Sequence, residues 1–295
     1  MVLALPEEMI RIDSAEGAAM LGSQPADAFV WSVLPQLATQ QTQALCSVAT
    51  SATMLNALGV EATVDPVYSP YAYFTQHNML GECARAQPSH VAGANVSLGF
   101  VMTHGATLRE WAGYLSCHAD VERFHASASS LEEFRSLASA ALRPTAQTPP
   151  RAVAINFYRR ELGEVGGGHM SPLAAYDPPS DRFLLLDVAR YKYGSGWATA
   201  ASLFEAMNTT DASSWAGQPP QSRGFVLVRP RSAPPAAPAA DSSAAPPATL
   251  YQDIRGSPVT YRCLGALFDE AARPGATQTA CTDEAKQVSE GAAGS

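Results

Sequence analysis

The stretch His169–Ala189 reads HMSPLAAYDPPSDRFLLLDVA and decides the fold class. Two apolar runs flank the turn residues Asp177–Asp181, and this pattern predicts an antiparallel β-hairpin. If the turn is centred on Pro178, His169 lies opposite Asp187. Directly opposed residues share a face of the sheet, with Cβ atoms roughly 4.5–5.5 Å apart. The hairpin therefore predicts an imidazole paired with a carboxylate, and a register slip of one residue would separate the two.

A structural role for this pair has to be weighed against a functional one. An isolated histidine is more often structural than catalytic, and an aspartate at a strand end often only caps a turn. Three glycines, Gly166 to Gly168, stand directly before His169. Glycine lets a substrate backbone approach closely or lets the chain adopt positive φ, and neither is needed to hold a surface histidine. The glycines favour a functional pair, and Gly168 is a predicted substrate-binding residue.

Segments on either side of the hairpin complete the fold class. Helices are predicted by apolar spacing or capping boxes at Leu45–Leu58, from Thr107, and from Ser130 to about Leu142. Strands are predicted at Arg151–Phe157, His169–Tyr176, Phe183–Ala189 and Gly224–Val228. A helical half followed by a β half predicts an α+β fold. We expect the helical N-terminal half to pack against a C-terminal antiparallel sheet, with the active site in the cleft between them.

Composition divides the chain into three parts. Residues 1–231 carry periodic apolar segments and form the predicted catalytic domain. Residues 232–250 are rich in Pro and Ala and form a predicted linker that cannot pack a core. Residues 251–295 form a predicted polar tail, with one short apolar patch at 263–268 that has room for a helix.

The overall composition is that of a globular protein with an acidic surface. Hydrophobic residues make up 46% and charged residues 16% of 295 positions, and the net charge is −8. This charge disfavours a nucleic-acid partner, because 19 basic residues stand against 27 acidic ones. No apolar run is long enough to cross a bilayer. The start shows no signal peptide, which favours a cytoplasmic location.

The cysteines point to one reactive thiol rather than to a metal site. There are five, Cys46, Cys83, Cys117, Cys263 and Cys281, an odd number with wide spacings and no C-x-x-C pair. This argues against both a disulfide framework and a tetrahedral zinc site.

Cys46 is the candidate nucleophile. It is expected in the first turn of a helix, where free N–H groups and the helix dipole favour a thiolate. A lone cysteine is more often a small buried hydrophobe. Gln40, six residues upstream, carries an amide that can donate to a developing oxyanion. Cysteine first, then a distant histidine with a nearby carboxylate, is the papain arrangement, in which His169 would pair with Cys46 and Asp187 would orient the ring.

Several longer stretches resemble one enzyme family. They are TQQTQALCSVATSATMLNALGV, YFTQHNML, GGGHMSPLAAYDPPSDRFLLLDVARYKYGSGW, and LFEAMNTTD followed by RGFVLV. In this order they resemble the phytochelatin synthase family from about Ile10 to Val228, and especially its short bacterial members. The resemblance implies a papain-like fold and cleavage of the Cys–Gly bond of glutathione. The acceptor would be a second glutathione, which gives phytochelatin, or water, which gives γ-glutamylcysteine and glycine.

The resemblance also implies roles for individual residues. Cys46 would form the γ-glutamylcysteinyl thioester, with His169 as acid and base and Asp187 as its orienting partner. Gln40 would serve the oxyanion hole. Arg190, Asp211 and Arg223 would line the substrate site, the last two holding the γ-glutamyl amino and carboxylate groups. No cofactor is expected to be tightly bound, and Cd²⁺ or Zn²⁺ would act as glutathione thiolate complexes. A homodimer is a further expectation.

Some features depart from the family pattern, and two other functions stay open. Ser47 replaces the usual glycine after the nucleophile and could alter the pocket, the loop from Asp211 to Arg223 is longer than expected, and the tail holds only Cys263 and Cys281. One alternative is a non-catalytic binder of glutathione or metal thiolates. Its scattered ligands would be Cys83, His77, His90, Cys117 and His118. The other alternative is a general papain-like peptidase, although no feature predicts a long peptide groove.

Overall fold

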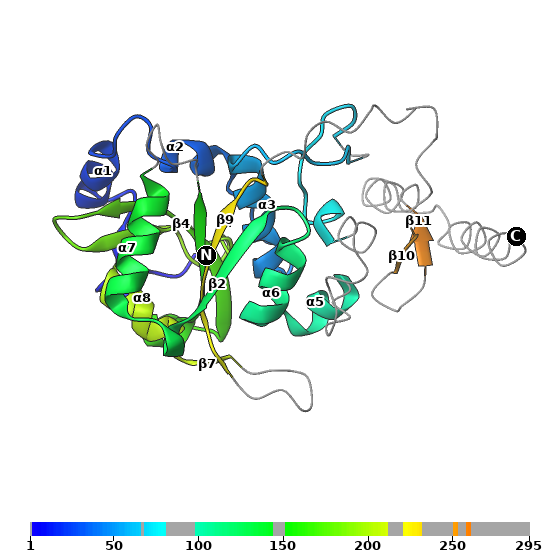
Figure 1. Cartoon of the computed structure of the whole chain (residues 1–295). Helices are drawn as coiled ribbons and strands as arrows, with labels where there is room; N and C mark the ends of the chain where they lie inside the picture. Colours follow the sequence, from blue (N-terminus) through cyan, green and yellow to red (C-terminus); the bar gives the residue numbers. More distant parts are fainter. Residues whose placement is uncertain are drawn as a thin grey trace, which may run out of the picture. The chain divides into compact units, whose positions relative to one another are not determined.

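The computed structural model describes residues 2–65, 68–80, 98–143, 151–211 and 221–231, together with two short strands in the C-terminal region. The chain divides into two compact units, Met1–Ser232 and Ala233–Ser295 (Figure 1). In the second unit the described strands are β10 (Leu250–Gln252) and β11 (Pro258–Thr260), which pair antiparallel. The first unit holds the large sheet, the described helices and all candidate site residues.

A seven-stranded antiparallel sheet is the centre of the first unit. Its strands follow the order β1-β6-β5-β4-β3-β9-β2. Their bounds, in chain order, are β1 Ile10–Arg11, β2 Asp120–His125, β3 Ala152–Tyr158, β4 Gly168–Asp177, β5 Arg182–Leu185, β6 Gly196–Thr199 and β9 Gly224–Arg229. A separate two-stranded ribbon pairs β7 (Thr210–Asp211) with β8 (Gln221–Ser222). The central strands β3, β4 and β9 are almost continuously buried, which explains their unbroken apolar runs.

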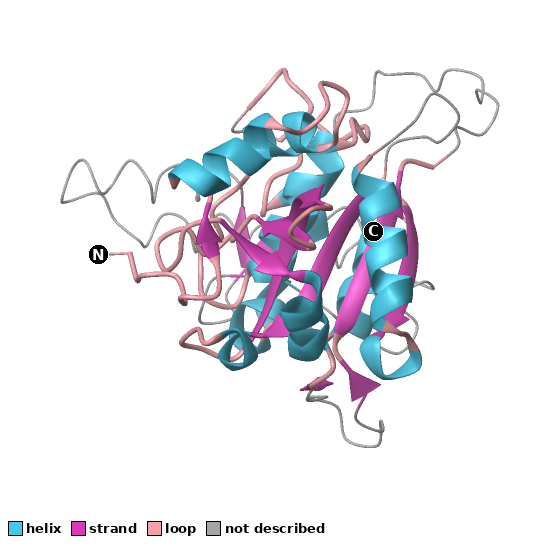
Figure 2. Ribbon diagram, turned by 90° about the vertical axis from the view of Figure 1, so that its left-hand side faces the viewer, coloured by secondary structure: helices cyan, strands magenta, loops and turns pink. Residues whose placement is uncertain are grey.

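Helices pack against this sheet (Figure 2). The described ones are α1 Ala15–Gly22, α2 Val30–Val33, α3 Cys46–Ala57, α5 Leu98–His104, α6 Leu108–Leu115, α7 Leu131–Leu142 and α8 Ala200–Met207. The α3 helix packs on β4, α7 packs on β3 and β4, and α8 packs on β3. Nearly every residue of α3 is buried, so its position is set by contacts along its whole length rather than by one apolar stripe. In the described part of the chain no helix is both long and apolar enough for a bilayer span.

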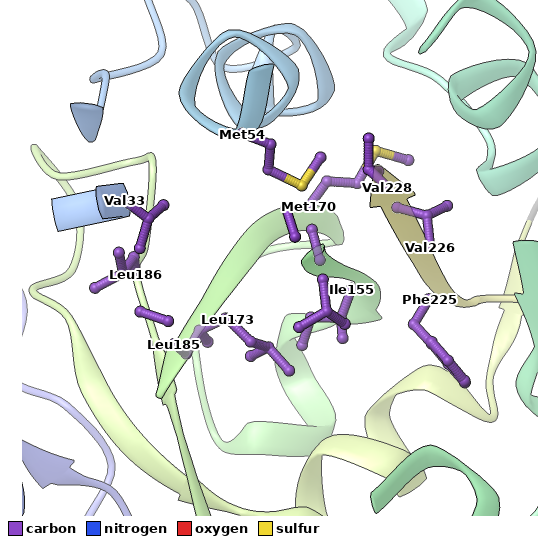
Figure 3. Close-up of a cluster of buried hydrophobic side chains, with 14 of the residues drawn as sticks. Val33, Met54, Ile155, Met170, Leu173, Leu185, Leu186, Phe225, Val226 and Val228 are labelled. Atoms are coloured by element: carbon purple, nitrogen blue, oxygen red, sulfur yellow. The ribbon is translucent and has the colours of Figure 1, made fainter. Parts of the chain in front are cut away.

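The core lies between the sheet and these helices. Figure 3 shows Met54 of α3 above Met170 of β4, while Phe225 of β9 points the other way. On that side Phe225 meets the ring of Phe134 from α7, with centroids 5.2 Å apart. Each of these side chains is at most 2% exposed. The sheet therefore holds α3 in a fixed position, and the first residue of α3 is Cys46.

Much of the expected secondary structure is confirmed. The helix expected at Leu45–Leu58 is α3, and the one expected from Ser130 to Leu142 is α7. Thr107 and Glu110 form both hydrogen bonds of the predicted capping box at the start of α6. The α+β fold class, with a large antiparallel sheet, is also confirmed.

The division into a helical half and a β half is too simple. β1 and β2 come from the first half of the chain and form the two edges of the sheet. They are short or half-exposed, so neither has the apolar run by which a buried strand is recognised. Leu250, expected in the linker, begins β10. The rest of the expected linker and most of the expected tail lie outside the described residues.

Candidate active site

The hairpin register differs from the expected one, although the expected contact between His169 and Asp187 forms. Leu173 pairs with Leu185, Asp177 pairs with Arg182, and a bulge lies between these pairs. The turn is therefore not centred on Pro178, and His169 is not directly opposite Asp187. The strand β5 ends at Leu185, before the predicted end at Ala189.

Asp187 reaches the histidine from the segment that follows β5. His169 Nε2 lies 2.8 Å from Asp187 Oδ1. Ser171 Oγ is 3.0 Å from the same nitrogen and also accepts from the backbone N–H of Val188, at 3.3 Å, so it links β4 to the Asp187 segment. Nε2 is thus engaged, which leaves Nδ1 as the ring nitrogen available to a nucleophile.

Cys46 is the first residue of α3, as the apolar spacing predicts. Leu45 at the N-cap provides no side-chain hydrogen bond, so the first-turn N–H groups are left for another acceptor. The thiol is free and only 7% exposed. Burial opposes its ionisation, but hydrogen bonding and charge attraction from His169, with the N–H groups of Met170 and Ser47, hold the pKa of Cys46 below its usual value.

The same electrostatics act on the other two groups. Burial disfavours the charged imidazole, yet the charge and hydrogen bond of Asp187 raise the pKa of His169 above its usual value. Burial also opposes ionisation of Asp187, but His169, Arg159 and the N–H of Ala189 lower its pKa to about 2. The three shifts together favour a thiolate beside an imidazolium, which is the reactive form of a thiol nucleophile.

A cavity of about 530 Å³ opens in front of Cys46 and His169. This volume falls in the range of roughly 300–1,000 Å³ that is usual for small-molecule sites. Its walls come from the start of α3, from the α5–α6 connection, and from the ends of β3, β4, β7 and the segment before β9. Its lining includes Thr42, Thr107, Asn156, Met170 and Arg223. The cavity therefore lies between helices and sheet, where the sequence places it.

Asp211 and Arg223 lie at this cavity as a loosely coupled pair. Asp211 Oδ2 accepts from the N–H of Leu108 at 2.7 Å and from Asn156 Nδ2 at 2.8 Å. Arg223 Nη2 is 3.8 Å from Asp211 Oδ1, which is too long for a hydrogen bond. Arg223 Nε is buried and has no hydrogen-bond partner among the described residues. The pair retains an acceptor oxygen and a donor for a ligand.

Gly168 has a steric reason to be glycine. It lines the cavity, and a Cβ atom there would lie 3.0 Å from Arg223 Nη2 and 3.3 Å from Arg223 Nε. Any side chain would therefore push against the guanidinium. The predicted substrate-binding role of Gly168 stays a prediction, and the geometry adds that this position gives room to Arg223.

Gln40 and Arg190 are placed less simply. Gln40 is 3% exposed, and its Nε2 donates to Thr42 O at 2.7 Å and to Tyr191 Oη at 2.9 Å. Both amide hydrogens are thus engaged, so donation to an oxyanion requires that one of these contacts be given up. Arg190 is exposed and does not line the cavity. The role of Arg190 in substrate binding stays a prediction, and the structure does not place this side chain at the cavity.

The departures from the family pattern lie partly inside and partly outside the described residues. Ser47 is fully buried and does not line the cavity, so its side chain is directed into the core rather than into the pocket. Residues 212–220, which make the loop before Arg223 long, lie outside the described residues, as do Cys263 and Cys281.

The metal-binder alternative loses one of its ligands. Cys117 is disulfide-bonded, so it is not available as a thiolate, and the argument from cysteine spacing against disulfides was wrong at this position. Cys83 and His90 lie outside the described residues. Among the residues that are described, no group of three or more His, Cys, Asp or Glu side chains is arranged to hold a metal ion. The expectation of no resident metal stays a prediction.

Three residues of the site were missed in the sequence. Asn156 stands in the buried strand β3, and a polar residue within the apolar run AVAINF is a signal that could have identified it. Arg159 and Glu164 lie behind Asp187 and are almost fully buried. Charged residues next to a glycine run are typical of an exposed loop, so no local signal distinguishes them.

Comparison with known proteins identifies the family of the chain. The family model described as phytochelatin synthase matches residues 1–225. Glutathione gamma-glutamylcysteinyltransferase 1 of Triticum aestivum is 32% identical over 198 residues, covering 67% of this chain and 35% of that protein. The enzyme of the same name from Lotus japonicus is 34% identical over 194 residues, covering 64% and 34%. A glutathione gamma-glutamylcysteinyltransferase of Schizosaccharomyces pombe is 28% identical over 247 residues, covering 78% and 51%.

The chain spans about a third of the length of these two plant relatives and about half of the yeast one. The matched region includes Cys46 and His169, which line one cavity, and Asp187, which contacts His169. Since the family model covers well over half of the chain, the chain belongs to the phytochelatin synthase family.

Proposed function

We propose that the chain cleaves the Cys–Gly bond of glutathione through a γ-glutamylcysteinyl thioester on Cys46. The observation that carries this proposal is the buried Cys46, with a lowered pKa, beside a histidine hydrogen-bonded to Asp187 at a small-molecule cavity. The relatives' names supply the substrate, since they are called glutathione gamma-glutamylcysteinyltransferases.

In the first half-reaction the Cys46 thiolate attacks the carbonyl carbon of the cysteinyl residue. The tetrahedral intermediate then expels glycine, while the His169 imidazolium gives its proton to the leaving nitrogen. Asp187 keeps the ring oriented and stabilises its charge throughout. Gln40 would contribute to the oxyanion hole by exchanging its contact with Tyr191 for the developing negative oxygen.

In the second half-reaction an acceptor attacks the thioester. Neutral His169 takes a proton from the acceptor as the acceptor attacks, and Cys46 leaves as a thiolate. If the acceptor is the amine of a second glutathione, the product is a phytochelatin with two γ-glutamylcysteine units. If it is water, the product is γ-glutamylcysteine. We propose that both occur, and that the hydrolytic branch is substantial.

The part of the cavity lined by Asp211 and Arg223 is proposed to hold the γ-glutamyl group. Arg223 would bind its α-carboxylate, because a guanidinium donates two parallel hydrogen bonds to a carboxylate. Asp211 Oδ1 would accept from its ammonium group. Both residues line the cavity, and the long distance of 3.8 Å between them allows a ligand to complete their hydrogen bonds.

Metal ions are proposed to act on the substrate rather than as a resident cofactor. Glutathione thiolates bind soft ions such as Cd²⁺ and Zn²⁺, and the resulting complexes would be acceptors in the transferase branch. Added Cd²⁺ should therefore increase phytochelatin formation while protein-bound metal stays substoichiometric. Formation of a homodimer is a further proposal, which size-exclusion chromatography with light scattering would test.

Incubation of the pure protein with glutathione, with products resolved by mass spectrometry, tests this function. We expect free glycine together with γ-glutamylcysteine, phytochelatin or both, and none of these from Cys46→Ala. Trapping of acylated Cys46 at low pH would identify the intermediate. If folded protein releases no glycine, with or without Cd²⁺, both branches of the proposal are wrong.

A further inference from the structure

A row of buried charges continues behind the catalytic histidine. Arg159 Nη2 lies 2.8 and 3.0 Å from the two oxygens of Asp187. Arg159 Nη1 donates to Glu164 on its other side. The side chains of Arg159 and Glu164 are only 3% and 1% exposed. The proposed chemistry uses Asp187 and assigns nothing to these two residues.

Arg159 by itself would work against the catalytic pair. A buried cation beside Asp187 offsets part of the negative charge that stabilises the imidazolium. Arg159 accordingly acts to lower the pKa of His169. Glu164 places a second carboxylate on the far side of the guanidinium. Its charge compensates Arg159, and the negative charge of Asp187 is then left for His169.

Glu164 is also part of the backbone connection into His169. Its N–H donates to Arg159 O at 3.0 Å, and the N–H of Arg159 donates to Gly167 O at 3.1 Å. These hydrogen bonds connect the glycine-rich segment at the start of β4 to Arg159, which contacts Asp187. Two further ionisable groups lie close to this pair: Lys192, whose Nζ lies by Gly166, and Tyr193, whose ring lies 5.3 Å from the Arg159 guanidinium.

We infer that Glu164 is a positioning residue that acts through Arg159, so that the charge of Asp187 serves the Cys46–His169 pair. This inference rests on the proposed function, because it assumes that Cys46 and His169 react as a thiolate and an imidazolium. It adds to the three catalytic residues an ion pair that touches neither substrate nor thiol.

The test is the pH dependence of Cys46 alkylation by iodoacetamide, measured by mass spectrometry of the Cys46 peptide. In the wild type we expect the alkylation rate to change in two pH ranges. The low-pH limb of the profile reports formation of the thiolate, and the upper limb reports loss of the imidazolium proton. Glu164→Gln keeps the shape and the acceptor oxygen for Arg159 but removes the charge. The upper limb should move to lower pH by about half a unit. Glu161→Gln makes the same change at an exposed position three residues away and should leave the profile unchanged.

The double variant Arg159→Gln/Glu164→Gln separates charge compensation from simple stabilisation. It removes both buried charges, so the upper limb should return toward its wild-type position, and this variant should fold even if Glu164→Gln alone does not. The inference is overturned if Glu164→Gln leaves the limb in place. It is equally overturned if the double variant shows the limb displaced to low pH. A wild type with only one ordinary thiol titration would instead contradict the proposed function itself.

Discussion

Two carboxylates of the site, Asp187 and Asp211, each lie beside an arginine, and burial opposes the ionisation of both, yet the pKa of Asp187 is lowered and that of Asp211 is raised. Asp187 receives two contacts from Arg159 at 2.8 and 3.0 Å and one from His169 at 2.8 Å, and its pKa falls to about 2. Asp211 lies 3.8 Å from Arg223, and burial raises its pKa despite its hydrogen bonds. Residue types alone do not set the pKa of a buried carboxyl group. The pKa falls only where close charged partners outweigh desolvation.

The difference matches the work proposed for each end. At the Asp187 end every charge has a partner, so the proton positions needed for catalysis are defined before substrate arrives. At the Asp211 end burial also lowers the pKa of Arg223, because the charge of Asp211 offsets only part of the desolvation. Incomplete pairing is unfavourable in the empty site, and a zwitterionic γ-glutamyl group would relieve it. One end is set up for reaction and the other for binding.

Asp187→Asn should give the largest effect, because the amide removes the charge that stabilises the imidazolium. We expect kcat to fall on the order of 10³-fold, or about 4 kcal/mol of barrier, with little change in KM. Glycine release under saturating glutathione measures it. Asp177→Asn makes the same change in the same hairpin, where Asp177 only caps the turn through Ser180, and should leave kcat unchanged. Equal losses in both variants would show that the effect is structural.

Arg223→Gln should affect binding rather than the chemical step. Loss of the fork that holds the γ-glutamyl carboxylate should raise KM by about 10- to 100-fold while kcat changes little. The matched control is Arg229→Gln at the end of β9, the strand that follows Arg223, where the side chain is 45% exposed beside Asp120. A fall in kcat at constant KM would mean that Arg223 acts on the transition state, and the contrast between the two ends would disappear.

The lowered pKa of Asp187 predicts how stability depends on pH. Because the folded pKa lies below the ordinary 3.8, at about 2, the stabilisation is present above the ordinary value and is lost as pH falls between the two. The shift corresponds to about 2 kcal/mol of unfolding free energy. Urea unfolding at pH 7 and near pH 2 should show the gap between wild type and Asp187→Asn narrowing by this amount. A gap that is constant with pH would contradict the assigned shift.

Ser130→Ala should give the smallest effect and separates stability from activity. Ser130 Oγ accepts from Glu133 N at 3.1 Å as the N-cap of α7. Its loss should cost about 1 kcal/mol of unfolding free energy. Ser139→Ala within the same helix should cost less, since that hydroxyl bonds only to a carbonyl in its own helix. Glutathione kinetics should be unchanged in both variants, and altered kinetics would show that the site depends on overall stability.

Local patterns were sufficient to predict many elements before any contact was known. Apolar spacing predicted α3, the capping boxes at Thr107–Glu110 and Ser130–Glu133 predicted the starts of α6 and α7, and four apolar runs predicted β3, β4, β5 and β9. The position of Cys46 at a helix start also follows from spacing, because helix phase and capping are properties of neighbouring residues. The sequence by itself therefore determined the α+β class, the place of the thiol and the choice of His169 and Asp187 as partners.

Only the tertiary structure decided how that partnership is made. A bulge shifts the hairpin register, so Asp187 meets His169 from beyond the end of β5 rather than from across the strand. Burial of Arg159 and Glu164 and the 3.8 Å gap between Asp211 and Arg223 depend on segments far apart in the chain. The physical reason is that desolvation and charge pairing act through space. Sequence spacing records which groups are present, whereas their pKa values and their free hydrogen-bonding atoms are set by the packing around them.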